Sequence, residues 1–202
     1  MKALLLIDIQ NDFIPGGSLA VPGGDEIIAI ANDLQSRFEV VVATQDWHPQ
    51  NHKSFASNHP GKNVFDVTDL NGLNQVLWPN HCVQGSRGAE FSNALNMNRV
   101  EAIFRKGTDS EIDSYSGFYD NGHRKSTALG EYLKGKQVTE VYIVGLAADY
   151  CVYYTAKDAI AEGFSTYIIE DAVRAINDDG FLQAKADIVN NGGTIIQSSS
   201  IV

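Results

Sequence analysis

The chain of 202 residues has only two cysteines, Cys82 and Cys151, and no long apolar run. Two cysteines allow at most one disulfide, which excludes a small secreted scaffold held together by several bridges. The longest early apolar run, ALLLI, is too short to span a bilayer, ends close to Asp8, and is followed by no small-residue cleavage site. We therefore expect a cytoplasmic protein with reduced thiols, and each thiol must be considered for chemistry.

Positive charge is also scarce. The chain has 15 lysine and arginine residues against 25 acidic residues, which gives a formal net charge of −10. Nucleic acids and anionic membranes require a basic face, so neither is expected as a partner, and the acidity is interpreted as an aid to solubility. No linker-like stretch and no run of like charge divides the chain. Residues 1–202 are therefore predicted to form a single domain.

Short apolar runs alternate with helical patterns along most of the sequence. Strands buried in a sheet are predicted for KALLLID, EVVVAT, RVEAIFRKG, EVYIVG, STYIIED and TIIQ. Helices are predicted within residues 25–38, 126–136, 149–163 and 179–193, with Asp25 capping the first and Gly163 ending the third. The alternation predicts a three-layer α/β/α fold, in which helices cover both faces of a mostly parallel central sheet.

Two stretches, residues 45–98 and 107–123, break this alternation. Long irregular stretches within one domain are more often functional than idle. The sequence has no internal repeat, and its glycine pairs lack the G-x-G-x-x-G spacing of a dinucleotide-binding turn. The irregular stretches are therefore expected to contribute to a functional site.

Polar residues follow several of the predicted strands. These residues are Asp8, Asp46, His48, Lys106, Asp149 and Cys151. Ligands of parallel sheets bind at the carboxyl ends of the strands, so these side chains are expected to meet at one rim. An acid, a base, a thiol and two candidate metal ligands would then lie close together.

Cys151 is the candidate nucleophile because it is placed where a loop enters a helix. The free N–H groups of a first helical turn, together with Lys106, are expected to stabilise a thiolate that attacks a carbonyl carbon. Asp8 is a candidate general base. Cys82 has no comparable setting and is predicted to be structural.

The stretch DWHPQNH contains candidate metal ligands in Asp46 and His48, and His81 in WPNHC can supply a third. Two histidines and one carboxylate leave coordination positions open, which suits a catalytic or substrate-binding ion more than a structural one. His52 remains open as a fourth ligand, as a residue that contacts a ligand, or as a solvated loop histidine. We favour the last two interpretations.

Six segments in the same order resemble the signature segments of nicotinamidases, within the isochorismatase-like cysteine hydrolases. They are LLLIDIQNDF, TQDWHPQNHKSF, LWPNHCVQGSRGAEF, FRKGTD, YSGF and VGLAADYCV. The resemblance implies a catalytic triad of Asp8, Lys106 and Cys151. It also implies that one divalent metal, with zinc preferred over iron or manganese, is bound by Asp46, His48 and His81.

The same resemblance implies how the pocket is built. The peptide bond between Leu146 and Ala147 is expected to be cis, and the N–H groups of Ala147 and Cys151 to form an oxyanion hole. Aromatic side chains are expected around the substrate ring, with core packing as the alternative for each. These side chains are Phe13 and Trp78, which would flank the ring, and Tyr115, which would close the pocket as part of a lid over residues 107–123.

The implied reaction is the hydrolysis of nicotinamide to nicotinate and ammonia through an acyl-enzyme on Cys151. This reaction would belong to NAD salvage, and pyrazinamide would be a further substrate. The metal would hold the pyridine nitrogen. Direct attack by a metal-bound hydroxide is the rival chemistry.

Three other functions compete with this interpretation. Another amidase or carbamoyl hydrolase of the superfamily would need no metal, and an isochorismatase typically lacks the nucleophilic cysteine. A non-catalytic protein on the same fold would only bind its ligand. The sequence fixes neither the metal nor the range of amides, and both a monomer and a homodimer fit it.

Overall fold

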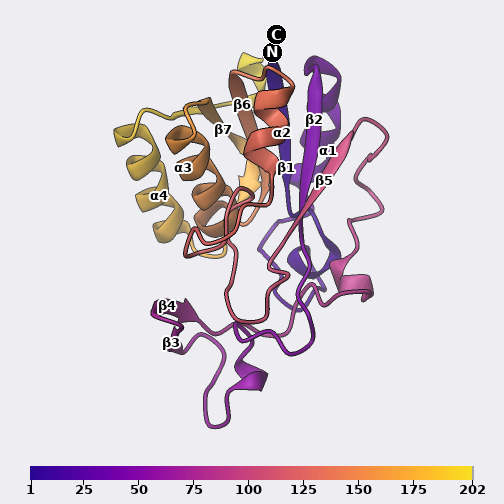
Figure 1. Ribbon diagram of the computed structural model, residues 1–202. Coiled ribbons are helices and arrows are strands. Elements are labelled where there is room, and N and C mark those ends of the chain that lie inside the picture. Colours follow the sequence, from indigo (N-terminus) through magenta and orange to yellow (C-terminus); the bar gives the residue numbers. More distant parts are fainter. Residues whose placement is uncertain (202) are drawn as a thin grey trace.

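A six-stranded parallel sheet forms the centre of the computed structural model, which describes residues 1–201 (Figure 1). In sheet order its strands are Ala102–Lys106 (β5), Val40–Asp46 (β2), Lys2–Ile7 (β1), Glu140–Leu146 (β6), Ser165–Arg174 (β7) and Thr194–Ile196 (β8). All neighbouring strands run parallel. The six predicted strands are all present, and the predicted sheet is confirmed.

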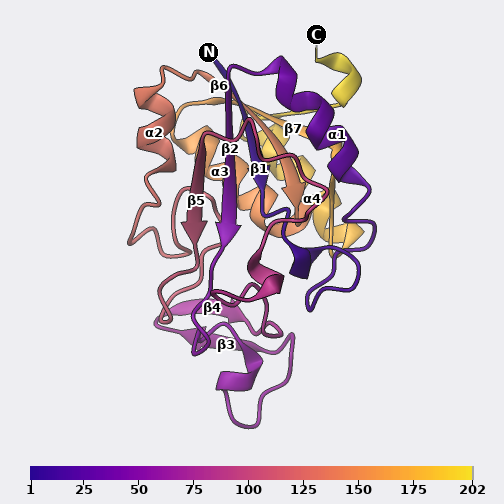
Figure 2. The same cartoon turned by 90° about the vertical axis from the view of Figure 1, so that its right-hand side faces the viewer.

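Helices cover both faces of the sheet, which confirms the three-layer architecture (Figures 1 and 2). They are Ile27–Leu34 (α1), Leu129–Gly135 (α2), Tyr153–Ala161 (α3) and Asp178–Asn190 (α4). Alternate residues of β1 serve the two layers. Leu4 and Leu6 pack in the cluster that contains α1, whereas Leu5 and Ile7 pack in the cluster that contains α2 and α3. Each of these fully buried side chains contributes about 1.5–3 kcal/mol of hydrophobic stabilisation.

One of the two predicted helix ends is wrong. The N-cap of α1 is Glu26, which already has helical dihedral angles, and no side chain caps the helix. The chain enters α1 through a continuous turn in which the Asp25 carbonyl accepts from the Ile28 N–H, so the Asp25 side chain is not needed as a cap. The other end is correct, because Gly163 follows α3 with a φ of +90° and donates to the Ile160 carbonyl.

The irregular region below the sheet contains one hairpin that was not predicted. Its strands are Val67–Leu70 (β3) and Leu73–Val76 (β4), joined by Asn71 and Gly72, which both have positive φ. An Asn-Gly pair is the usual signal for such a turn, but the strands are short and carry little apolar alternation. Figure 2 shows this hairpin projecting beyond the carboxyl ends of the central strands. None of the helices within residues 1–201 has the length and apolar character needed to cross a membrane.

Candidate active site

The carboxyl ends of the central strands bring four polar side chains together. Asp46 and Lys106 end β2 and β5 and are paired across the two strands in register. Asp8 directly follows β1, and Cys151 lies in a widened turn, Ala148–Val152, that leads from β6 into α3. All four residues are buried, with exposed fractions of 6% or less.

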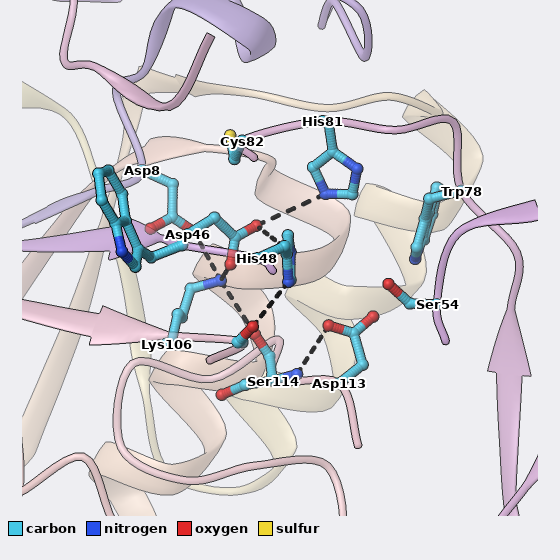
Figure 3. Close-up of polar contacts among 12 residues, drawn as sticks. Asp8, Asp46, His48, Ser54, Trp78, His81, Cys82, Lys106, Asp113 and Ser114 are labelled. Carbon is cyan, nitrogen blue, oxygen red and sulfur yellow. Dashed lines mark hydrogen bonds and ion pairs between the residues drawn. The ribbon is translucent and has the colours of Figure 1, made fainter. Parts of the chain in front are cut away.

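Lys106 is the centre of this cluster (Figure 3). Its Nζ donates hydrogen bonds to Asp46 Oδ1 at 2.6 Å, to the Ser114 carbonyl at 3.0 Å and to Cys151 Sγ at 3.4 Å. An ammonium has three N–H donors, so these bonds use all of them. Asp8 Oδ2 lies 2.9 Å from Nζ as an ion pair but accepts no hydrogen bond from any residue in 1–201. This oxygen therefore keeps a lone pair available for a proton.

The opposite oxygen of Asp8 is fixed by Thr44, which donates from Oγ1 to Oδ1 at 2.6 Å. The Thr44 hydroxyl also accepts from the Asp8 backbone N–H at 3.2 Å. Thr44 precedes Asp46 by two residues in β2 and so points to the same side of the strand, which is a signal that sequence reasoning could have used.

Burial decides the protonation states of the cluster. It raises the pKa of the Asp8 carboxyl, an effect that Lys106 only partly opposes. It also raises the pKa of the Cys151 thiol well above its usual range, against the opposing charge of Lys106. Lys106 does favour the thiolate, as expected, but the loss of hydration outweighs its charge. The nucleophile rests as a thiol and needs a base, and a carboxylate oxygen of Asp8 lies within 4.8 Å of its sulfur.

The three residues expected to bind a metal converge beside this cluster. Asp46 Oδ2 lies 3.5 Å from His48 Nε2 and 3.7 Å from His81 Nε2, and all three side chains are buried. His48 Nδ1 donates to the Gly107 carbonyl at 2.9 Å and His81 Nδ1 to the Pro79 carbonyl at 2.8 Å. Since a carbonyl only accepts, each Nδ1 carries the proton and each Nε2 presents a lone pair. One carboxylate and two such imidazoles fit a divalent metal such as zinc.

Backbone contacts hold these ligands in place. The side-chain amide of Gln10 donates to the Asp46 carbonyl and accepts from the Asp46 N–H, both at 2.8 Å. Gly107 has a φ of +65°, and a Cβ at this position would overlap the His48 ring. Sequence reasoning identified neither residue, although Gly107 directly follows the predicted Lys106 strand end.

A cavity with an empty volume of about 330 Å³, counting space open to solvent, connects the two clusters. All three predicted aromatic residues line it, as do Ala147 and Cys151; the full lining is Phe13, Leu19, Asp46, Trp78, His81, Asp113, Tyr115, Ala147, Tyr150, Cys151 and Ile176. Trp78 Nε1 and Gln75 Nε2 both donate to the Tyr115 hydroxyl, at 3.2 and 3.1 Å. The tyrosine is thereby fixed in the cavity wall rather than in solvent. Leu19, Asp113, Tyr150 and Ile176 were not predicted.

The turn before Cys151 has the expected backbone. The peptide bond between Leu146 and Ala147 is cis. The Ala147 N–H, on the cavity wall, donates to no group within residues 1–201. Asp149 is separate from the cluster, because its carboxylate accepts the backbone N–H groups of Ile176 and Asn177 at 3.0 and 2.9 Å.

The remaining histidine and cysteine of interest are both buried. His52 is fully buried, so it is not a solvated loop residue. Its ring centroid lies 4.4 Å from that of His48, and burial lowers its pKa to about 4. Cys82 is also fully buried, burial raises its pKa well above the usual range, and its N–H donates to Asp12 Oδ2 at 2.7 Å. This setting agrees with a structural role for Cys82.

A family model described as the isochorismatase domain matches residues 2–200 of the chain. The chain belongs to the isochorismatase family. Within this family it is 48% identical over 201 residues to a nicotinamidase of Acinetobacter baylyi, which covers 99% of the chain and 94% of that protein.

Two solved structures are similar to this chain of the isochorismatase family in both fold and sequence. A nicotinamidase pyrazinamidase of Acinetobacter baumanii has a TM-score of 0.96 and 48% identity, covering all of this chain and 98% of the other. A pyrazinamidase of Pyrococcus horikoshii, in complex with zinc, has a TM-score of 0.80 and 38% identity, covering 97% and 98% of the two chains. Both similarities extend over nearly the whole fold.

Proposed function

We propose that this protein is a metal-dependent cysteine amidohydrolase that converts nicotinamide to nicotinate and ammonia, and pyrazinamide to its acid, in NAD salvage. The observation that carries the proposal is the buried cluster of Asp8, Lys106 and Cys151, which reaches a small aromatic cavity through Cys151. The similarity to nicotinamidases and pyrazinamidases supports the substrate. In this proposal, residues 1–202 form one cytoplasmic domain. Its partner is a small molecule rather than a nucleic acid or a membrane. The protein acts as a monomer or a homodimer.

The first half of the reaction makes the acyl-enzyme. Asp8 Oδ2 takes the proton of the Cys151 thiol, and the sulfur attacks the amide carbon. The N–H groups of Ala147 and Cys151 stabilise the oxyanion, where the loss of one donor typically costs on the order of 100-fold in rate. Asp8 then returns its proton to the amide nitrogen, ammonia leaves, and a thioester remains on Cys151. Throughout, Lys106 compensates the charge on Asp8.

The second half releases the product. Asp8, again ionised, takes a proton from a water molecule that attacks the thioester carbon. The carbon–sulfur bond breaks, the sulfur recovers its proton from Asp8, and nicotinate leaves. Each proton removed by Asp8 is returned, so the enzyme regains its starting state.

Asp46, His48 and His81 would hold the divalent metal, with zinc preferred because it accepts this donor set and because a similar pyrazinamidase was solved with zinc. When bound, the metal supplies a Lewis-acid contact for the pyridine nitrogen and so orients the ring. Phe13 and Trp78 flank the ring, and Tyr115 closes the cavity.

The test is ammonia release from nicotinamide by the purified protein, with Cys151→Ala measured in parallel. Release by the natural protein alone is expected. Release by both proteins would assign the attack to a metal-bound hydroxide. Release by neither, with metal supplied, would turn attention to other amides and then to a binding role.

A further inference from the structure

His52 presents an unused polar atom in the buried region beside the metal ligands. Its side chain is fully buried, and Nε2 has no hydrogen-bond partner within residues 1–201. The Ile112 carbonyl lies close enough to raise the pKa of His52, but it does not have the geometry of a hydrogen bond to this nitrogen. Buried polar groups in native proteins nearly always form a hydrogen bond, so we expect Nε2 to bond to a partner outside the polypeptide.

The hydrogen bonds of Ser54 show which nitrogen of His52 carries the proton. The Ser54 backbone N–H donates to Nδ1 at 3.2 Å, and the Ser54 hydroxyl lies 2.7 Å from the same nitrogen. Since a backbone N–H only donates, Nδ1 is the acceptor and Nε2 carries the proton. This tautomer is opposite to that of His48 and His81. A protonated nitrogen cannot bind a metal, whereas it can donate to an oxygen.

Asp113 supplies the complementary acceptor. One ligand atom from each of His48, His52 and Asp113 lies within 4.8 Å of the others, and Asp113 is buried in the cavity wall. Its two oxygens accept from Gln75 Nε2 at 2.9 Å and from the Ser114 N–H at 2.8 Å, which leaves each with a further lone pair. In Figure 3, His48 lies between the carboxylates of Asp46 and Asp113.

We propose that His52 and Asp113 are positioning residues for the metal, which hold a water molecule in a coordination position that the protein leaves open. His52 donates its Nε2–H to the water oxygen, and Asp113 accepts a proton of the same water. His52 is then not a fourth ligand, and the open positions are divided between this water and the substrate. The inference rests on the metal site of the proposed function.

The first experiment counts the histidines on the metal. The protein is loaded with Cu²⁺, and electron spin-echo modulation from remote imidazole nitrogens gives the number of coordinated rings. Two rings are expected in the natural protein and in His52→Gln, and one ring in His81→Asn. Three rings that fall to two in His52→Gln would make His52 a ligand and overturn the proposal.

The second experiment measures Zn²⁺ affinity by competition with a chelator. His52→Phe and Asp113→Asn are expected to weaken binding by about 10- to 100-fold, as is usual for residues that orient a metal's ligands. His52→Gln, whose side-chain amide can still donate, should recover most of the affinity. His123→Gln is the control, because that side chain is 59% exposed. Circular dichroism verifies that each variant is folded.

Unchanged Zn²⁺ affinity in both His52→Phe and Asp113→Asn would overturn the proposal and leave His52 as packing beside the Ile112 carbonyl. Neither experiment depends on ammonia release. A failure of the proposed reaction would therefore show in the activity test alone, and a failure of this inference would show in the metal measurements alone.

Discussion

The central sheet and the irregular segments contribute to the same cavity but hold their residues by different means. Asp46 and Lys106 are fixed by strand pairing, so their positions follow from the register of the whole sheet. His48 and His81 lie outside the sheet, and each is oriented by one hydrogen bond to a backbone carbonyl. The proposed triad thus lies at or just beyond the carboxyl ends of the strands together with one metal ligand, Asp46, whereas the loops supply the two histidine ligands and much of the substrate wall. Substitutions in the two parts should therefore fail in different ways.

The largest effect is expected at the sheet side of the cavity. Cys151→Ala should reduce ammonia release by on the order of 10⁴-fold or more, because no other group there can form the acyl-enzyme. The measurement is kcat for nicotinamide hydrolysis, with Zn²⁺ content determined in the same sample. Cys82→Ala is the matched control, and its kcat should stay within about twofold since Cys82 is outside the cavity lining. A kcat of Cys151→Ala close to that of the control would contradict the division between the two parts.

Lys106→Met tests how far the strand ends depend on one cation. Its removal leaves Asp8 and Asp46 buried without their counter-ion, and the free energy of unfolding should fall by about 3–5 kcal/mol. Urea denaturation followed by fluorescence measures this. Lys157→Met, which breaks a half-exposed pair with Asp187, should lower it by less than about 1 kcal/mol. Equal losses in the two variants would mean that the buried cluster has no special role in stability.

Gly107→Ala tests the loop side, because a methyl group at this position would overlap His48. The ring must move, and we expect Zn²⁺ affinity to fall by on the order of 100-fold and KM to rise, while the thiol cluster stays intact. Chelator competition and steady-state kinetics are the measurements. Gly135→Ala is a suitable control, since a Cβ there meets nothing within 4 Å. A lower kcat at saturating metal and substrate would show that the two parts are not separable.

Tyr115→Phe should have the smallest effect. It removes the acceptor of a buried hydrogen bond from Trp78 and leaves that indole N–H unpaired, whereas Gln75 Nε2 keeps the Val76 carbonyl and Asp113 as acceptors. The cost of about 1–3 kcal/mol should appear as a KM increased by roughly 10-fold with kcat nearly constant. The comparison of KM and kcat decides the result. A fall in kcat alone would assign the hydroxyl to the chemical step.

The sequence predicted the sheet side of the site better than the loop side, for a physical reason. Apolar runs mark strands, and parallel pairing brings their polar ends together, so the strand pattern alone placed Asp8, Asp46 and Lys106 at one rim. Loop residues obey no such periodicity. His81 was proposed only because Asp46 and His48 need a third ligand, and Trp78 was found only through resemblance to a family. Asp113 was missed because nothing in its spacing marks it.

Burial was the other property that the sequence could not supply. The helix turn and Lys106 favour a thiolate at Cys151, but the pKa of the thiol depends on how completely the fold removes water from it. The same holds for His52, whose tautomer follows from the position of the Ser54 N–H. The burial of Cys151 arises from packing among segments that are distant in the sequence, whereas the His52 tautomer is set by a neighbour two residues away.

The position of β1 between β2 and β6 has a consequence for how the chain is synthesised. β1 leaves the ribosome before the other strands of the sheet, and its second neighbour begins only at Glu140. At about 5–20 residues per second, the interval is on the order of ten seconds, during which one edge of a strongly apolar strand has no partner. A nascent chain of this length already contains Asp8, the metal ligands and Lys106 but not the nucleophile. Premature termination before β6 would therefore yield an inert fragment with an exposed edge, which is a natural substrate for chaperones and proteases.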